Sequence, residues 1–321
     1  MSNKVAKPAT ILKEFFSKPE HFADVINAVF FDGNEVVCPE MLMEADTDVS
    51  STIQVKDKTI SLERFRDVVK KTVYGCDWVI VGLENQLKVH YGMPLRTMTY
   101  DVLNYLKQCE EVREKHKKEK SKPTAEEFLS GLKRGDKLHP VFTLVIYYGE
   151  DRWDGPLSLR DMLDVPEDWK IFLPDYGMNL LEVRESGRYH FRNQEVDEVF
   201  EISRTIFEKN YAILKEKYGK KEISTEAAMA VGAITGSKRL LRYVTESEKG
   251  EMNMCRALEE LEQEAMERGV ERGLERGFER GKSEQALIIV KNMLRKGLDM
   301  KDIAEMAEVP LEIVRKVKAE L

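Results

Sequence analysis

The sequence of 321 residues has few cysteines and no surplus of positive charge. The cysteines follow neither the spacing of a zinc site nor a paired pattern; they are Cys38, Cys76, Cys109 and Cys255. Because disulfides are rare in reducing compartments, this usage predicts a cytoplasmic protein. The formal net charge of −7 argues against a protein that coats nucleic acid nonspecifically, since that affinity comes from neutralising phosphates. An enzyme with a local basic cleft is still allowed.

Long apolar runs are also missing. No segment approaches the roughly 20 apolar residues of a membrane span, and no apolar run near the N-terminus resembles a signal peptide. We therefore expect no membrane partner. Charge is abundant instead, at 34% of residues, in a chain long enough for one large or two modest domains. This combination predicts a globular part joined to solvated helical segments.

Two neighbouring segments, 66–75 and 78–86, have the composition of strands joined by a tight turn at 75–77. Alternate residues of a strand share one face. Asp67 therefore begins one face of the first strand, and Glu84 projects from the end of the second. If the strands pair in antiparallel sense, the two acids become cross-strand neighbours that can hold one divalent cation. The alternative is that both acids end their strands in water, and the periodicity does not decide between these interpretations.

The flanking sequence sets these strands in a wider pattern. We expect helical structure over 11–31 with a break at Pro19, an irregular or weakly extended segment over 36–58, and a helix from 95 to about 120. A buried strand is expected over 139–149. The resulting order is helix, weak strand, strand, strand, helix, strand. Further helices are expected to dominate 193–249.

This order of elements, with Asp67 and Glu84 on the two paired strands, resembles that of the PD-(D/E)XK nuclease superfamily. More specifically, the chain resembles the Rpn family of recombination-promoting nucleases and putative transposases. The residues that carry the resemblance are Arg66-Asp67-Val68, Gly82-Leu83-Glu84-Asn85-Gln86, His90-Tyr91-Gly92-Met93-Pro94-Leu95-Arg96, Tyr100-Asp101, His139-Pro140-Val141 through Tyr147-Tyr148-Gly149, and Trp153-Asp154-Gly155-Pro156-Leu157-Ser158-Leu159. The resemblance implies an α/β fold with a restriction-endonuclease-like αβββαβ core and an α-helical C-terminal extension.

The resemblance also implies a catalytic site. Asp67, Glu84 and Gln86 correspond to the catalytic residues, and Asp67, Glu84 and the Asn85 carbonyl to ligands of Mg²⁺ or another divalent cation such as Mn²⁺. The implied protein is a DNA endonuclease that hydrolyses phosphodiester bonds and is associated with recombination or mobile elements. Gln86 stands where many members of the superfamily carry lysine. Because a neutral amide orients water through hydrogen bonds alone, the cation must contribute more of the activation.

Further residues are candidates for the site. Members of the superfamily often have another acid on the first helix, and Glu14 and Asp24 are the candidates, although neither matches strongly. The candidates for contact with substrate phosphate are Lys70, Lys71, His90 and Tyr91. Lysines on an exposed strand more often serve solubility, and the histidine is equally well placed to cap the helix that follows.

A four-residue unit of Glu-Arg-Gly and one apolar residue repeats over 267–281. Each glycine costs about 1 kcal/mol of helix propensity relative to alanine, and favourable charge pairs return only about 0.2–0.5 kcal/mol each. An isolated helix would therefore be marginal. Glycines four residues apart form a smooth strip that permits close approach of a second helix. The repeat predicts a helical stalk that is either flexible or self-associating, and self-association through it would make the protein a homo-oligomer.

The expected domains are a nuclease-like domain over 1–235 with its core at about 9–150, a charged stalk over 236–282, and a helical tail over 283–321. The tail pattern predicts helices over 286–296, over 300–308 and from Pro310. Its spacing fits a helix-turn-helix-like unit, which either reads DNA or packs on itself. At the level of the whole chain, the alternative to an endonuclease is a catalytically inactive nuclease fold that binds DNA or another protein.

Overall fold

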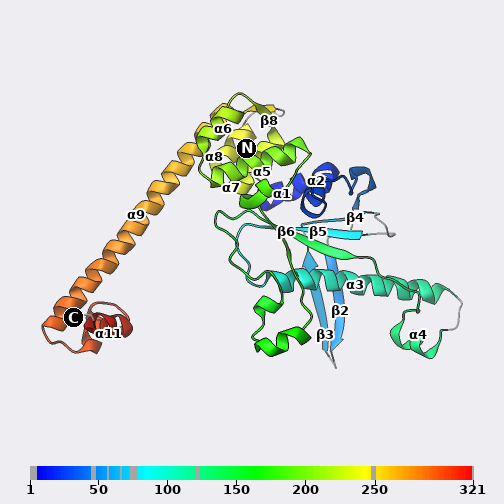
Figure 1. Ribbon diagram of the computed structural model, residues 1–321, viewed down its shortest axis with the longest axis horizontal. Helices are drawn as coiled ribbons and strands as arrows, with labels where there is room; N and C mark the ends of the chain where they lie inside the picture. The colour runs from blue at the N-terminus through cyan, green and yellow to red at the C-terminus, as the bar shows by residue number, and fades with distance from the viewer. Residues whose placement is uncertain are drawn as a thin grey trace. The chain divides into compact units, whose positions relative to one another are not determined.

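The computed structural model describes residues 6–44, 48–55, 58–65, 67–72, 79–119, 123–246 and 251–319. The chain divides into two compact units, Met1–Glu260 and Leu261–Leu321. The first is a mixed α/β unit with a five-stranded sheet, and the C-terminal region is helical (Figure 1). The expected combination of an α/β part and a helical C-terminal extension is confirmed at this level.

The sheet of the first unit contains antiparallel and parallel pairs. Its strands, in spatial order, are β1 (Met43–Glu44), β4 (Val68–Thr72), β5 (Val79–Gln86), β6 (Val141–Tyr147) and β7 (Asn179–Glu182). The pairs β1–β4 and β4–β5 are antiparallel, whereas β5–β6 and β6–β7 are parallel. Parallel neighbours need a long crossover, and between β5 and β6 this crossover contains the helix α3 (Met93–Lys118).

Helices cover both faces of this sheet (Figure 1). On one face lie α1 (Pro8–Ser17) and α2 (Pro19–Phe30), where the rings of Phe30 and Phe142 are 4.9 Å apart. On the other face lies α3, whose Tyr105 packs against the cluster of Val69 and Val141. A strand that is covered on both faces is mostly apolar along its length, which explains why Thr143 is the one small polar residue in the sequence of β6.

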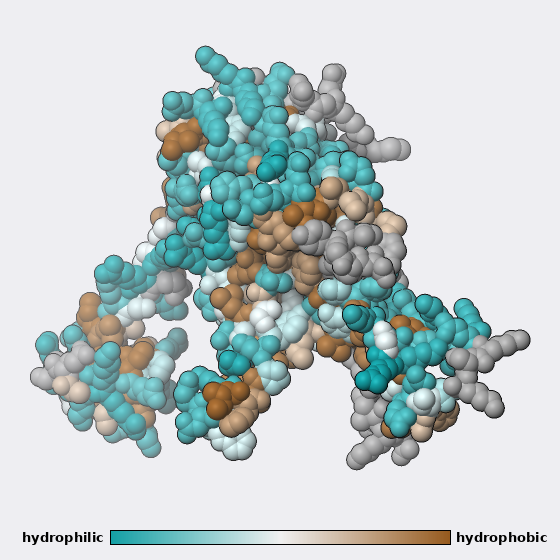
Figure 2. Space-filling model, turned by 45° about the vertical axis from the view of Figure 1, so that its right-hand side comes forward, coloured by the Kyte–Doolittle hydropathy of each residue, from teal (hydrophilic) through white to brown (hydrophobic). Residues whose placement is uncertain are grey.

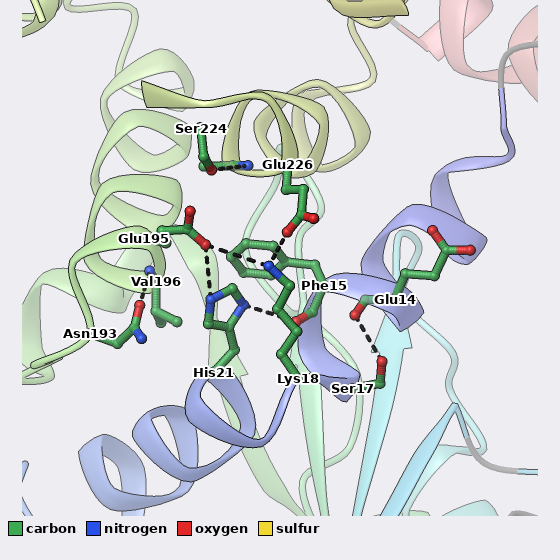
Figure 3. A network of polar contacts seen from close by, with 11 residues as sticks. Glu14, Phe15, Ser17, Lys18, His21, Asn193, Glu195, Val196, Ser224 and Glu226 are labelled. Atoms are coloured by element: carbon green, nitrogen blue, oxygen red, sulfur yellow. Dashed lines mark hydrogen bonds and ion pairs between the residues drawn. The ribbon is translucent and has the colours of Figure 1, made fainter. Parts of the chain in front are cut away.

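The first two helices meet at the break that proline predicts. Pro19 occupies the first turn of α2, where its missing N–H costs nothing. Just beyond the break, His21 is 3% exposed and its ring nitrogens lie 2.9 Å from the Phe15 carbonyl oxygen and 3.0 Å from Glu195 Oε2 (Figure 3). Burial lowers the pKa of His21. These contacts tie the junction to the helix that begins at Gln194.

The expectation for 36–58 needs correction. Instead of an irregular or weakly extended segment throughout, the structure has two regular antiparallel strands, β2 (Asp48–Val55) and β3 (Lys58–Phe65), with eight paired positions. The alternation of β-branched and polar residues in both segments favours this hairpin. The turn expected at 75–77 lies outside the described residues.

The remaining elements of the first unit are mainly helical, as expected for 193–249. They are η1 (Pro39–Met41), α4 (Ala125–Ser130), η2 (Arg160–Met162), η3 (Glu167–Phe172), η4 (Val183–Arg188), α5 (Gln194–Phe207), α6 (Tyr211–Tyr218), β8 (Glu222–Ser224), α7 (Thr225–Thr235), α8 (Lys238–Glu246) and β9 (Glu251–Asn253).

The C-terminal region is built around α9 (Met254–Arg295), a helix of 42 residues that runs through the whole repeat. Gly297 follows it with φ of +78°, the left-handed conformation that favours glycine after a helix. The helices α10 (Met300–Met306) and α11 (Leu311–Ala319) come next. The expected order of three helices is thus present, although the first continues directly from the stalk. Their core consists of Val290, Ile303, Val314 and Val317.

The repeat exposes an apolar stripe on α9. Its members are each more than half exposed: Met266, Val270, Leu274 and Phe278. The glycines beside them have open space, because a Cβ added at any of them would meet no described atom within 4 Å; they are Gly269, Gly273, Gly277 and Gly281.

The visible face in Figure 2 is mostly hydrophilic, with separate apolar patches, as expected for a chain in which 34% of residues are charged. In the described part of the chain, no helix has the length and apolar character required to cross a membrane.

Candidate functional site

The two acids singled out in the sequence meet at one end of the β4–β5 pair. Val68 pairs with Leu83 in this antiparallel ladder, so Asp67 and Glu84 occupy the next position. The backbone N–H of Asn85 donates to Asp67 Oδ2 at 2.7 Å. The cross-strand approach that the alternation of side chains predicts is therefore present.

Glu84 is almost fully enclosed, with 3% of its surface exposed. Its Oε1 lies 2.7 Å from Nη2 of Arg96 and accepts a hydrogen bond from Gln86 Nε2 at 3.2 Å. The hydroxyl of Tyr100 lies 3.5 Å from the same oxygen. A buried carboxylate is costly unless it is paired and hydrogen-bonded, and here α3 supplies the positive charge.

Arg96 is held at this place by its own helix. Its Nε donates to the Tyr100 hydroxyl at 2.8 Å, and its guanidinium carbon lies 5.7 Å from the centre of the Tyr100 ring. Burial works against the charge of Arg96, but Glu84, Tyr100 and Asp67 outweigh it and raise the pKa of Arg96. The guanidinium is therefore electrostatically coupled to both acids.

Tyr148 completes the cluster. It directly follows β6 and is 4% exposed. Burial raises the pKa of Tyr148 to about 12, and the charges of Asp67 and Glu84 act in the same direction. The phenol is thus neutral beside the two acids and can donate or accept a hydrogen bond without adding charge.

Sequence reasoning missed Arg96 and Tyr100 as partners of Glu84. Both belong to the segment that carried the resemblance, and their spacing of four residues places them on one side of a helix. This spacing is the feature of the sequence that could have identified the two residues as neighbours. The register of α3 against the end of β5 decides which residue that side meets, and this register is not a property of the local sequence.

Gln86 and Asn85 take different positions on β5. Gln86 shares a face with Glu84 and donates to it, as the alternation predicts. The side chain of Asn85 alternates to the opposite face, and neither of its buried polar atoms has a hydrogen-bond partner among the described residues.

The structure separates the two candidate lysines. Lys70 is 1% exposed. Its Nζ lies 2.5 Å from Oε1 of Glu44 on the neighbouring strand β1 and 5.8 Å from the ring centre of Phe22 on α2. It is therefore not brought together with the acids. Lys71 lies on the same strand face as Asp67, further along β4.

His90 and Tyr91 lie in the connection from β5 to α3. The carbonyl of His90 accepts a hydrogen bond from Met93 N at 2.9 Å, so its backbone contributes to the start of the helix. Tyr91 is 63% exposed and lines an open cavity of about 610 Å³ together with Asp154. The tyrosine hydroxyl donates to Asp154 Oδ1 at 3.3 Å.

The two candidate acids of the first helices have different surroundings. Glu14 is exposed on α1, and its side chain points away from the network drawn in Figure 3. Asp24 lies on α2, on the face of the sheet opposite α3, and its Oδ1 accepts a hydrogen bond from Arg192 N at 2.8 Å. Burial raises the pKa of Asp24, although the N–H groups of Arg192 and Asn193 oppose this shift.

Asp67 and Glu84 form a pair of hard oxygen donors. No group of three or more His, Cys, Asp or Glu side chains in the described ranges is arranged to hold a metal ion. Mg²⁺ is often bound by only one or two carboxylates and keeps several waters. The residues present therefore fit a divalent cation whose remaining ligands are water and phosphate.

Comparisons with protein-family models, with curated proteins and with solved structures find no match.

The raised pKa of Tyr148 predicts a specific loss of stability at alkaline pH. Folding favours the neutral phenol of Tyr148. Its contribution to the free energy of unfolding is therefore fully present below the ordinary tyrosine pKa of 10.0, and it is lost as the pH rises through about 12. Tyr148→Phe should therefore flatten the fall in unfolding free energy over this window. Urea denaturation of both proteins at a series of alkaline pH values measures the difference, and equal slopes would contradict the assignment.

Proposed function

We propose that the protein is a divalent-cation-dependent DNA endonuclease with a restriction-endonuclease-like core. The succession of α1 and α2, then β1, β4 and β5, then α3 and β6 supports this proposal, because it follows the expected αβββαβ order with β2 and β3 as an inserted hairpin. The observation that carries it is the meeting of Asp67 and the buried Glu84 at one ladder position. A link to recombination or mobile elements follows from the motif resemblance.

The residues of the cluster have distinct roles in this proposal. Asp67 and Glu84, with the Asn85 carbonyl, would hold the cation. A divalent cation bound there supplies a water of lowered pKa and polarises the scissile phosphate. Gln86, which already contacts Glu84, orients that water through its amide. Tyr148 keeps its proton, because its surroundings disfavour the phenolate.

A second candidate function is supported by the Arg96 contact. Its guanidinium already neutralises Glu84 in the structure, so the carboxylate has a counter-charge without any metal. In a catalytically inactive nuclease fold that binds DNA or another protein, the salt bridge between Arg96 and Glu84 would remain as it is and would serve only to stabilise the fold. The two candidates therefore differ in whether Asp67 and Glu84 are needed for cleavage.

The endonuclease proposal predicts that supercoiled plasmid is nicked in the presence of Mg²⁺. Asp67→Asn and Glu84→Gln keep the size of each side chain and remove its charge. Each should slow nicking by about a hundredfold or more, because loss of a ligand removes several kcal/mol of transition-state stabilisation. Initial rates of conversion to open-circular DNA measure the effect.

Glu111→Gln is the matched control, since Glu111 is an exposed acid on α3 and its variant should nick like the wild type. Thermal unfolding of all variants verifies that they fold. Equal nicking by the wild type and both site variants, or none by any of them, would remove the assigned site, and the absence of nicking would favour the inactive module.

We also propose that α9 pairs with α9 of a second copy through the stripe and glycines of the repeat. Replacing Gly273 and Gly277 by alanine should raise helix propensity by about 1 kcal/mol per site while blocking close approach of a second helix. The double variant should therefore be more helical and less dimeric in sedimentation experiments. Glu275→Ala changes the opposite side of the helix and should stay dimeric. A wild type that is monomeric at every concentration would contradict the pairing.

A further inference from the structure

The candidate site has a positive charge that its strand motif does not provide. Gln86 is neutral, whereas Arg96 reaches Glu84 from α3. We propose that Arg96 is an exchangeable counter-cation: it neutralises Glu84 until a divalent cation binds, and it then binds the phosphate of the nucleic-acid substrate. This inference deepens the proposed endonuclease function and rests on it.

The carboxylate of Glu84 needs a counter-charge. With 3% of its surface exposed, the carboxylate has lost most of its hydration, and an unpaired buried charge destabilises a fold by several kcal/mol. The contact with Arg96 Nη2 at 2.7 Å meets this need before any metal arrives. The pair therefore keeps the site assembled in the metal-free protein.

Arg96 and a divalent cation exclude each other from direct contact with Glu84. A guanidinium and a divalent cation are both positive, and they repel each other strongly at contact distance in a partly buried site. Arg96 and the cation therefore compete for Glu84, so binding of one weakens the binding of the other. Because 34% of the Arg96 side chain is exposed, its guanidinium can leave Glu84 toward solvent without breaking the core.

Once it has left Glu84, the Arg96 guanidinium can bind a phosphate group. Tyr100 holds the inner part of the guanidinium through Nε at 2.8 Å and through its ring. The Nη2 end can therefore exchange partners while Nε stays in place. A planar guanidinium matches two phosphate oxygens at once, and Asp67 and Glu84 place the cation beside it. Arg96 thus supplies the charge that Gln86 lacks.

Cation binding without DNA tests the exchange. Mn²⁺ serves as the probe, with its affinity measured by electron paramagnetic resonance at fixed pH. Arg96→Gln removes the guanidinium that competes with the cation for Glu84, so this variant should bind Mn²⁺ about tenfold more tightly. The size of the effect follows because a charge in contact with a carboxylate shifts the ionic equilibria of that carboxylate by about one to three powers of ten. Arg96→Lys keeps a positive charge and should bind like the wild type.

Arg113→Gln is the matched control, because Arg113 is exposed on the same helix and bonds to the Ser130 carbonyl. It should leave Mn²⁺ affinity unchanged. Thermal unfolding shows which variants are folded. If Arg96→Gln is unstable, Arg96→Lys provides the comparison: because it keeps the competing charge, it should bind Mn²⁺ within about twofold of wild type, and binding about tenfold tighter than wild type would overturn the exchange. Equal Mn²⁺ affinity of wild type and folded Arg96→Gln overturns the exchange.

Nicking kinetics test the phosphate contact separately. Arg96→Gln should raise KM for plasmid by about tenfold, as expected for loss of a charged hydrogen bond, and Arg96→Lys should restore part of the affinity. An unchanged KM in an active Arg96→Gln variant overturns the phosphate role and leaves the endonuclease proposal intact. Tighter Mn²⁺ binding without nicking by any protein supports the exchange at Glu84 and removes the endonuclease function.

Discussion

The buried carboxylate of Glu84 is the constraint on which the rest of the site depends. A charge with 3% exposure requires partners from more than one element, and it obtains them from β5 itself and from α3. The salt bridge to Arg96 links the beginning of α3 to the end of β5. Removing that carboxylate would therefore take away a partner of Arg96 as well as a candidate ligand of the cation.

The sheet explains why the two acids meet. The antiparallel β4–β5 pair aligns Asp67 with Glu84, and the parallel step to β6 requires α3 to cross one face. The same step brings Tyr148, directly after β6, toward both carboxylates. Residues far apart in the sequence thus converge because the strands end together, while α1 and α2 occupy the other face and carry Asp24 away from this cluster.

The sequence predicts the parts of this arrangement that depend on local rules. The alternation of strand residues predicts the approach of Asp67 and Glu84, and Pro19 predicts the break between α1 and α2. The same alternation places Lys70 on the opposite face from Asp67, so the separation of Lys70 from the acids was predictable as well.

Other parts depend on packing between distant segments. The partnership of Arg96 with Glu84 is set by the docking of α3, and the burial of Asp24 is set by the turn before α5, 168 positions away along the chain. The β2–β3 hairpin, by contrast, follows a local alternation of β-branched and polar residues, so its absence from the sequence-based expectation was not imposed by packing. The continuity of α9 through its glycines also exceeds what propensities predict, since the repeat alone would form only a marginal helix.

Crystals grown with Mn²⁺ would show whether Asp67 and Glu84 hold one divalent cation and whether that cation displaces Arg96, through anomalous diffraction at the manganese edge. We expect an anomalous peak in contact with both carboxylates and an Arg96 guanidinium that has left Glu84. Density without a peak between the acids, with Arg96 still bound to Glu84 at saturating Mn²⁺, would contradict this expectation.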